Sequence, residues 1–105
     1  GWQVATLSTA EVSDKAGFLR ETARAFAFPG WFGLNWDALD ESLGDLEIQQ
    51  GMLVLWEGWG ELAQRDPGTF EVALDVLRQR AQDPRLPPFA VLLMGGGPDQ
   101  ELPLL

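Results

Sequence analysis

The chain has no cysteine and no histidine among its 105 residues. Without cysteine there is no disulfide framework, no thiol nucleophile and no cysteine metal site. Without histidine the sequence lacks the commonest general base and the commonest transition-metal ligand. An enzyme built from this chain would have to work with carboxylates alone, so we expect no catalytic activity, no cofactor and no metal site.

Basic residues are also scarce, because seven Lys and Arg stand against sixteen Asp and Glu. The net charge of −9 at pH 7 repels the phosphates of nucleic acid and of anionic lipids, and it attracts a cationic partner. We therefore expect a basic protein as the partner, and neither nucleic acid nor a membrane as a ligand.

Long apolar runs are missing too. The longest, at 52–56 and 89–94, are far too short to span a bilayer, and the first residues do not resemble a signal peptide. Hydrophobic residues make up 46% of the chain and charged residues 22%, which is typical of one globular domain at this length. We expect a soluble, cytoplasmic protein.

Strand and helix signals alternate along the chain. Apolar patterns predict strands at 2–7, 52–56 and 89–94, and helices are expected at 13–27, 35–43, 61–65 and 67–81. Ser13, Asn35 and Asp66 are the expected N-caps, and Gly44 is expected to end the second helix. This order predicts an α/β fold, a small three-stranded parallel sheet packed with helices. We expect one domain over residues 1–94 and a loosely held C-terminal tail over 95–105.

The segment 28–47, FPGWFGLNWDALDESLGDLE, is the most unusual part of the sequence. From residue 25 to residue 64 the chain has seven carboxylates and no Lys or Arg. These acids are Asp37, Asp40, Glu41, Asp45, Glu47, Glu57 and Glu61. A solvated surface is the plainer interpretation, but solvated helix faces usually mix charges of both signs.

On the second helix the acids share one spacing. Asp37, Glu41 and Asp45 lie four residues apart, with Asp40 beside them, while Leu39 and Leu43 form an apolar stripe. Like charges at that spacing destabilise a helix by about 0.2–0.5 kcal/mol per pair. A one-sign face that lowers stability indicates a role outside the domain.

Aromatic residues surround the acidic helix. Trp31 lies in a loop between Pro29-Gly30 and Gly33, a setting that favours exposure and is typical of a binding hot spot. We expect Gly33 to have a backbone conformation closed to other residues. Most aromatics belong to cores, and we expect this of Phe32, Trp36 and Trp56.

The run Pro29-x-Trp31-Phe32-Gly33-x-Asn35-Trp36-Asp37-Ala38-Leu39-x-Glu41-x-Leu43 resembles the barstar family of intracellular ribonuclease inhibitors. The aromatic-aromatic-Gly-x-Asn-x-Asp-Ala-Leu pattern is fairly specific, and a weaker likeness extends over residues 2–94. The resemblance implies a three-stranded parallel sheet with helices packed on it and no enzymatic activity. It also implies that the loop and the second helix plug a ribonuclease active site, where an acidic side chain takes the place of a substrate phosphate.

The resemblance also assigns roles to single residues. It matches Glu41 to the phosphate-mimicking acid, Asp37 to the acid one turn earlier, Asn35 to the loop asparagine and Trp31 to the first loop aromatic. Asp40 stands where the family has an aromatic residue, so either Asp40 or Glu41 could replace the phosphate. Late in the fourth helix, where the family has a further acid, this chain has the segment 78–80, Arg-Gln-Arg.

Three functions remain as hypotheses. The first is a ribonuclease inhibitor that forms a one-to-one complex with a basic ribonuclease or a related toxin. The second is a hydrolase whose clustered acids hold Mg²⁺ or Ca²⁺, although no basic residue nearby in the sequence would hold an anionic substrate. The third is an acidic interaction or immunity module with a non-ribonuclease partner. The sequence favours the first, with these partner-binding residues: Trp31, Gly33, Asn35, Asp37, Asp40, Glu41 and Asp45.

Overall fold

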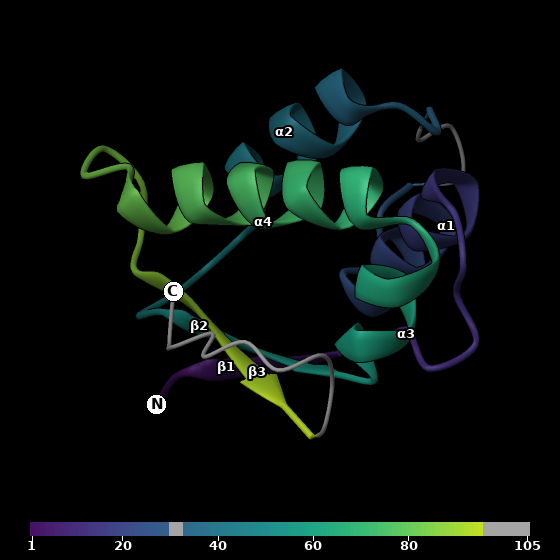
Figure 1. Cartoon of the computed structure of the whole chain (residues 1–105). Helices are drawn as coiled ribbons and strands as arrows, with labels where there is room; N and C mark the ends of the chain where they lie inside the picture. Colours follow the sequence, from purple (N-terminus) through teal and green to yellow (C-terminus); the bar gives the residue numbers. More distant parts are fainter. Residues whose placement is uncertain (30–32, 96–105) are drawn as a thin grey trace.

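Strands and helices alternate in the computed structural model, which describes residues 1–29 and 33–95. The elements follow one another as β1 (Gln3–Ser8), α1 (Lys15–Ala25), α2 (Trp36–Gly44), β2 (Met52–Glu57), α3 (Trp59–Arg65), α4 (Pro67–Gln82) and β3 (Phe89–Met94). Figure 1 shows the helices gathered above a small sheet. The predicted α/β fold with three strands is confirmed.

The sheet is parallel, with β2 between β1 and β3. Gln3 lies opposite Met52, and Met52 lies opposite Phe89. Each β–α–β connection returns the chain to the same edge of the sheet, which is why three strands of this sequence can run in one direction. The predicted parallel arrangement is confirmed.

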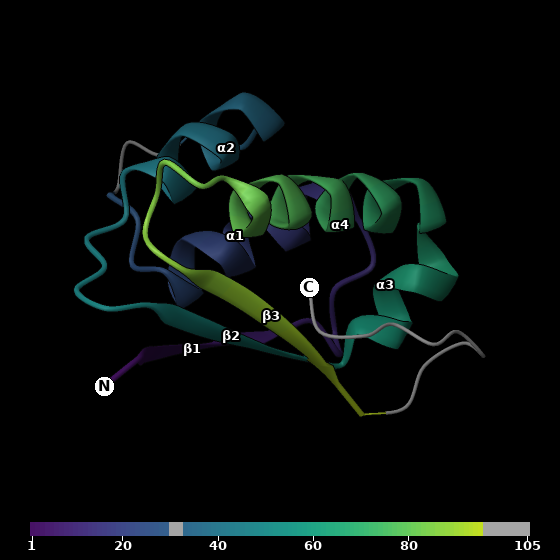
Figure 2. The same ribbon diagram turned by 90° about the vertical axis from the view of Figure 1, so that its left-hand side faces the viewer.

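The helices cover only one face of this sheet. Figures 1 and 2 show α1, α2 and α4 on the same side of the strands. On the other face, Val4 of β1 is 60% exposed and Leu92 of β3 is 39% exposed, while Leu53 and Leu55 of β2 are half-buried. The continuous apolar run at 52–56 predicts a central strand buried on both faces. This prediction is wrong, because no described helix packs on the second face.

The core centres on Trp56 of β2, which is fully buried. Its ring lies 5.5 Å from that of Phe18 in α1 and 5.6 Å from that of Phe70 in α4, centroid to centroid. The indole Nε1 donates a hydrogen bond of 2.8 Å to the Thr9 hydroxyl, which satisfies a polar group that has no access to water. Trp56 is therefore a core residue, as predicted, and it ties the sheet to two helices.

Capping side chains set where the helices begin. Asn35 and Asp66 cap α2 and α4 as predicted, and their side-chain oxygens accept from backbone N–H groups at 2.8 and 3.2 Å. The cap of α1 is Asp14 and not Ser13, because its carboxylate accepts from the Gly17 N–H at 2.8 Å. A carboxylate satisfies that N–H and also interacts favourably with the positive end of the helix.

Glycines lie at the ends of β2 and α2. Gly58 and Gly60 follow the apolar run at 52–56, and both are expected to break the strand. Gly58 makes the turn, with φ +68°, but Gly60 is buried inside α3. A Cβ on Gly58 would lie 2.5 Å from the Ala10 backbone nitrogen, so no other residue fits there. Gly44 is the last residue of α2, and the cap is Asp45 with an ordinary right-handed φ of −91°.

Candidate functional site

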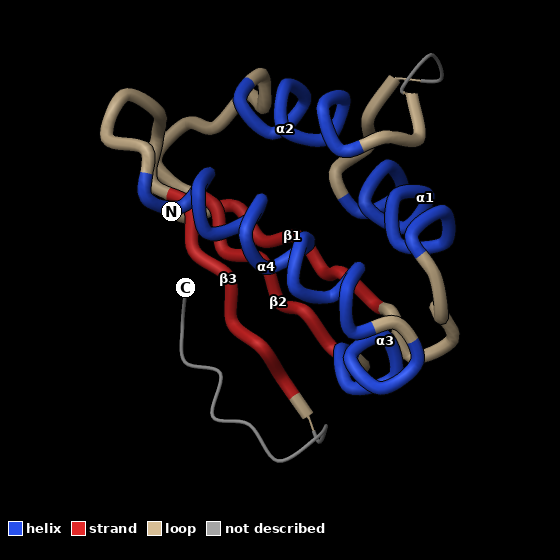
Figure 3. Tube along the Cα trace, turned by 45° about the horizontal axis from the view of Figure 1, so that its top comes forward, coloured by secondary structure: helices blue, strands red, loops and turns tan. Residues whose placement is uncertain are grey.

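Helix α2 presents the acidic face, and its apolar stripe holds it in place. Leu39 and Leu43 are fully buried, and the helix packs against α4 and α1. Figure 3 shows α2 on the outer side of these two helices, away from the strands. Trp36, in the first turn, is half-buried and its ring lies 5.9 Å from that of Phe18. The predicted core role of Trp36 is therefore confirmed only in part, because the side chain is half-buried and not fully enclosed.

The acids of α2 are all exposed. Asp37, Asp40 and Glu41 lie in the helix, and Asp45 is its C-cap residue. Within residues 1–29 and 33–95, none of these four carboxylates forms an ion pair with a Lys or Arg, although four such pairs exist elsewhere. The surface of α2 therefore carries uncompensated negative charge, which the sequence pattern had indicated.

Two of the seven acids counted in the sequence belong to a different region. Glu57 ends β2 and accepts a hydrogen bond of 2.6 Å from the Ser8 hydroxyl. Glu61 lies in α3 and pairs with Arg65 at 2.8 Å. Both have partners within the chain, so they do not add to the acidic face of α2.

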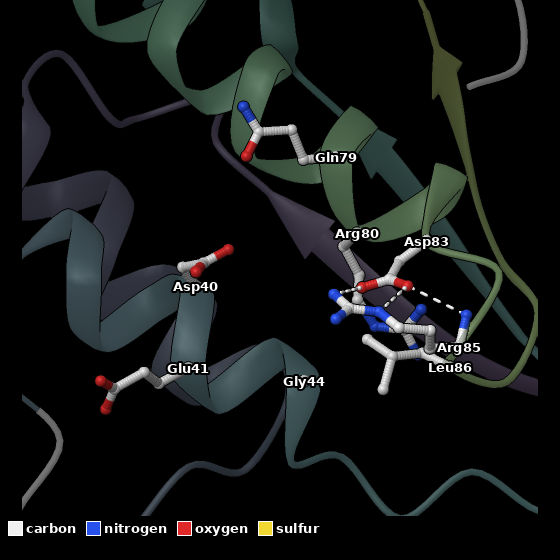
Figure 4. A pocket seen from close by; sticks show the side chains of 8 residues that line it. All are labelled: Asp40, Glu41, Gly44, Gln79, Arg80, Asp83, Arg85 and Leu86. Carbon is white, nitrogen blue, oxygen red and sulfur yellow. Dashed lines mark hydrogen bonds and ion pairs between the residues drawn. The ribbon is translucent and has the colours of Figure 1, made fainter.

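A hollow of about 540 Å³ lies beside α2, between it and the end of α4 (Figure 4). Asp40 and Glu41 line it from α2, and Gln79 lines it from α4. On the far side Asp83 accepts hydrogen bonds from the Arg85 guanidinium at 3.0 and 2.9 Å. These bonds, with one from the backbone N–H of the same arginine, lower the pKa of Asp83 from 3.8 to about 2. The hollow is thus acidic on one side and carries a fixed ion pair on the other.

A smaller hollow of about 310 Å³ lies on the opposite flank of α2. Its floor includes Phe26 and Phe28 from the end of α1, and Glu41 and Asp45 stand at its edge. Glu41 lines both hollows, so it lies where two concave parts of the surface meet. Of the neighbouring acids, Asp40 lines the larger hollow and Asp45 the smaller one.

The end of α1 directs the chain toward this site. Ala27 has a left-handed φ of +54°, unusual for a residue with a side chain. The Ala27 N–H donates to the Arg24 carbonyl and the Phe28 N–H donates to the Ala23 carbonyl, at 3.3 and 3.0 Å. This pair of bonds is a Schellman motif, which ends the helix and turns the chain toward Pro29.

The loop before α2 is described only in part. Trp31 and Phe32 lie outside the described residues, so their predicted exposed and core roles stay predictions. Gly33 follows them directly, so the backbone conformation expected of Gly33 stays a prediction as well. Its backbone carbonyl accepts from the Asn35 N–H at 2.9 Å, and an added Cβ would lie 3.0 Å from Asn35 Nδ2. Close approach to Asn35 is what favours glycine here.

Asn35 has a structural role that precedes any contact with a partner. Its Oδ1 accepts the Ala38 N–H at 2.8 Å and so caps α2. The side chain is nevertheless exposed, and its amide nitrogen donates none of the hydrogen bonds found among the described residues. Asn35 therefore fixes the start of the acidic helix and leaves a donor at the surface.

The sequence missed the cations that the fold brings to α2. Lys15 of α1 lies with its Nζ 5.6 Å from the centroid of the Trp36 ring. Arg80 and Arg85 reach the larger hollow from the end of α4. No local pattern could have shown these neighbours, because they are distant from α2 in sequence and meet it only through helix packing.

The acids do not gather as metal ligands. In the described residues, 1–29 and 33–95, no three acidic side chains are placed to hold a metal ion together. None of the helices in that part of the chain is both long enough and apolar enough to cross a membrane.

Comparison with known protein families gives a match. The family model described as Barstar (barnase inhibitor) matches residues 2–94, which is most of the chain. No curated protein matches the sequence.

Proposed function

The chain belongs to the barstar family of barnase inhibitors, and from this we propose that it inhibits a basic ribonuclease of the barnase class. Inhibition would occur by occlusion, with α2 and the loop before it placed over the active site of the enzyme. Members of this family are inhibitors and not enzymes. We propose the same for this chain, which has neither a histidine nor a cysteine for catalysis.

The exposed, unpaired acids of α2 are the observation that supports this function best. A ribonuclease must bind a phosphate, so its cleft presents cations. A carboxylate placed among those cations forms charge-assisted hydrogen bonds like those of the substrate phosphate. A metal enzyme would instead need its acids gathered around one point, and the acids of α2 are spread along a convex helix.

We assign the phosphate-like role to Glu41, since it lines both hollows beside α2. Asp40 is the alternative, because it faces the larger hollow. Asp37 and Asp45 add to the field that attracts a basic partner. Asn35 shapes the start of the helix and Gly33 the turn before it, while Trp31 is proposed as the aromatic hot spot of the loop.

A second candidate is an acidic immunity module whose partner is a toxin other than a ribonuclease. The segment 78–80, Arg-Gln-Arg, favours keeping this candidate, because the family has a further acid late in the fourth helix and this chain does not. We propose a cytoplasmic location under either function, where such an inhibitor would protect its own cell.

Titration against barnase and several other small basic secreted ribonucleases tests the proposal. We expect one-to-one inhibition, with about 800 Å² buried on each partner. Association should be fast at low salt and much slower at high salt, because salt screens the attraction between exposed charges on the two proteins. If none of these enzymes is inhibited, the immunity-module function replaces the inhibitor function.

The matched controls remove equal charge from different places. The triple variant D37N/D40N/E41Q removes three acids from α2, and E11Q/E71Q/D75N removes three from other surfaces. Only the first should slow association and weaken inhibition strongly. Equal effects from both would mean that net charge, and not the acidic face of α2, governs binding.

A further inference from the structure

Arg80 of α4 is a buried arginine without an acidic partner. The residue is 4% exposed, and no carboxylate in the described parts of the chain forms an ion pair with its guanidinium. Burial lowers the pKa of Arg80, and the nearby charge of Asp83 opposes that effect. Burying an unpaired cation is costly, so its position calls for an explanation.

The guanidinium joins three parts of the fold. Nε donates a hydrogen bond of 3.1 Å to the carbonyl of Leu43 in α2, and Nη1 donates one of 3.1 Å to the carbonyl of Pro87, just before β3. The group also lies 4.8 Å from the centroid of the Phe89 ring. Nη2 is buried and has no hydrogen-bond partner among residues 1–29 and 33–95. Arg80 therefore bridges α4, the end of α2 and the start of β3.

The end of α2 needs a cation that its own sequence does not supply. The carbonyl of Leu43 is one of the last four of the helix, which have no N–H partner within it. The helix has no basic residue in its last turn, and it carries acids from Asp37 to Asp45. The negative end of the helix dipole and the negative charges of the carboxylates therefore add to one another at this end of α2.

We propose that Arg80 is a positioning residue for the acidic surface of α2: it holds the end of this helix against α4 and supplies a positive charge from beneath. The inference rests on the proposed function in giving α2 the binding role. A cation on the outer surface would occupy the carboxylates, and a partner would have to displace it. A cation below the helix leaves Asp40 and Glu41 free while it fixes where they stand beside the larger hollow.

Hydrogen exchange on the free protein tests this role with Arg80→Met and Arg80→Lys. Methionine keeps the apolar stem without charge or donors, and lysine keeps the charge without the planar fork. Arg78→Met is the control, because Arg78 lies on the same helix, pairs with Asp75 and makes no hydrogen bond to α2.

We compare the amides of α2 near Leu43 and Asp45 with those of β2 near Val54. In Arg80→Met the α2 amides should accelerate at least tenfold more than the β2 amides, since the helix end is released locally. Arg80→Lys should show a smaller difference, and Arg78→Met none. Equal acceleration of both elements, or no change in either, would make Arg80 an ordinary core residue. If Arg80→Met does not fold, the same comparison is read from Arg80→Lys.

Binding to barnase separates this inference from the proposed function. If α2 loosens in Arg80→Met but neither parent nor variant binds any ribonuclease, the positioning role stands and the inhibitor function is wrong. If the parent inhibits and α2 stays rigid in both Arg80 variants, the function stands and the positioning role is wrong.

Discussion

Replacing Glu41 with glutamine should make the free protein more stable. The Glu41 side chain is exposed and forms no ion pair or hydrogen bond within the described residues, so folding loses no contact. Asp37 and Asp45 lie four residues to either side, and each like-charge pair destabilises by about 0.2–0.5 kcal/mol. Removing the charge relieves both pairs, so we expect a gain of about 0.4–1 kcal/mol at low ionic strength.

The same substitution should weaken the complex. Loss of one partner from a buried, hydrogen-bonded charge pair costs about 2–5 kcal/mol, a range to which the barnase–barstar complex itself contributes. Most of this cost arises because the cations of the nuclease are left buried without a counter-charge. Stability and binding should therefore change in opposite directions, and no purely structural role of Glu41 would produce that result.

Urea denaturation at low and high salt measures the first effect, and titration with an inhibited ribonuclease measures the second. Glu71→Gln is the control, since this acid is exposed on α4 and lines neither hollow. A Glu41→Gln protein that is less stable than its parent would reveal an internal partner that our account lacks. A variant that binds as tightly as the parent would remove Glu41 from the phosphate-like role, and Asp40→Asn would then be tested in its place.

Thr9→Val should destabilise the protein by about 1–3 kcal/mol in urea denaturation, because the buried Trp56 Nε1 loses the only acceptor that it has among the described residues. Thr6→Val, on the exposed face of β1, should change little. Stability should fall as the pH drops from about 4 toward 2, because the pKa of Asp83 is about 2 in the folded protein and 3.8 otherwise. Asp83→Asn should lose that part of the acid dependence in thermal unfolding followed between pH 5 and pH 2. Trp31→Ala should weaken ribonuclease binding by more than about 1 kcal/mol with little change in melting temperature; an easily unfolded variant that still binds would place Trp31 in the core.

Local signals in the sequence were enough for most of the fold. The alternation of strands and helices and the caps Asn35 and Asp66 follow from residues close together in the chain. The parallel sheet follows in turn from the order of these elements. The choice between Ser13 and Asp14 could not be made from sequence, because both residues can cap a helix and one position separates them.

Long-range packing explains what the sequence did not reveal. The open face of the sheet was hidden because all residues at 52–56 are apolar, so their pattern does not show which side is covered. In the sequence, nothing distinguishes Arg80 from the basic residues of a solvated helix end, yet its side chain donates to a carbonyl 37 positions earlier in the chain. The exposed acids of α2, in contrast, were predicted correctly because the helical spacing alone separates them from Leu39 and Leu43.

The parallel pairing of β1 with β2 has a consequence for synthesis on the ribosome. Ser8 and Glu57 meet at the end of this pair although 49 positions separate them. At a synthesis rate of about 5–20 residues per second, β2 is completed roughly 2–10 s after β1. Arg80 is added at a similar interval after α2. The acidic helix is thus synthesised before the residue that holds its end in place. A nascent chain that stops short of α4 would expose the carboxylates of α2 without Arg80 to hold the helix end. Under the proposed function, such a chain should not inhibit a nuclease.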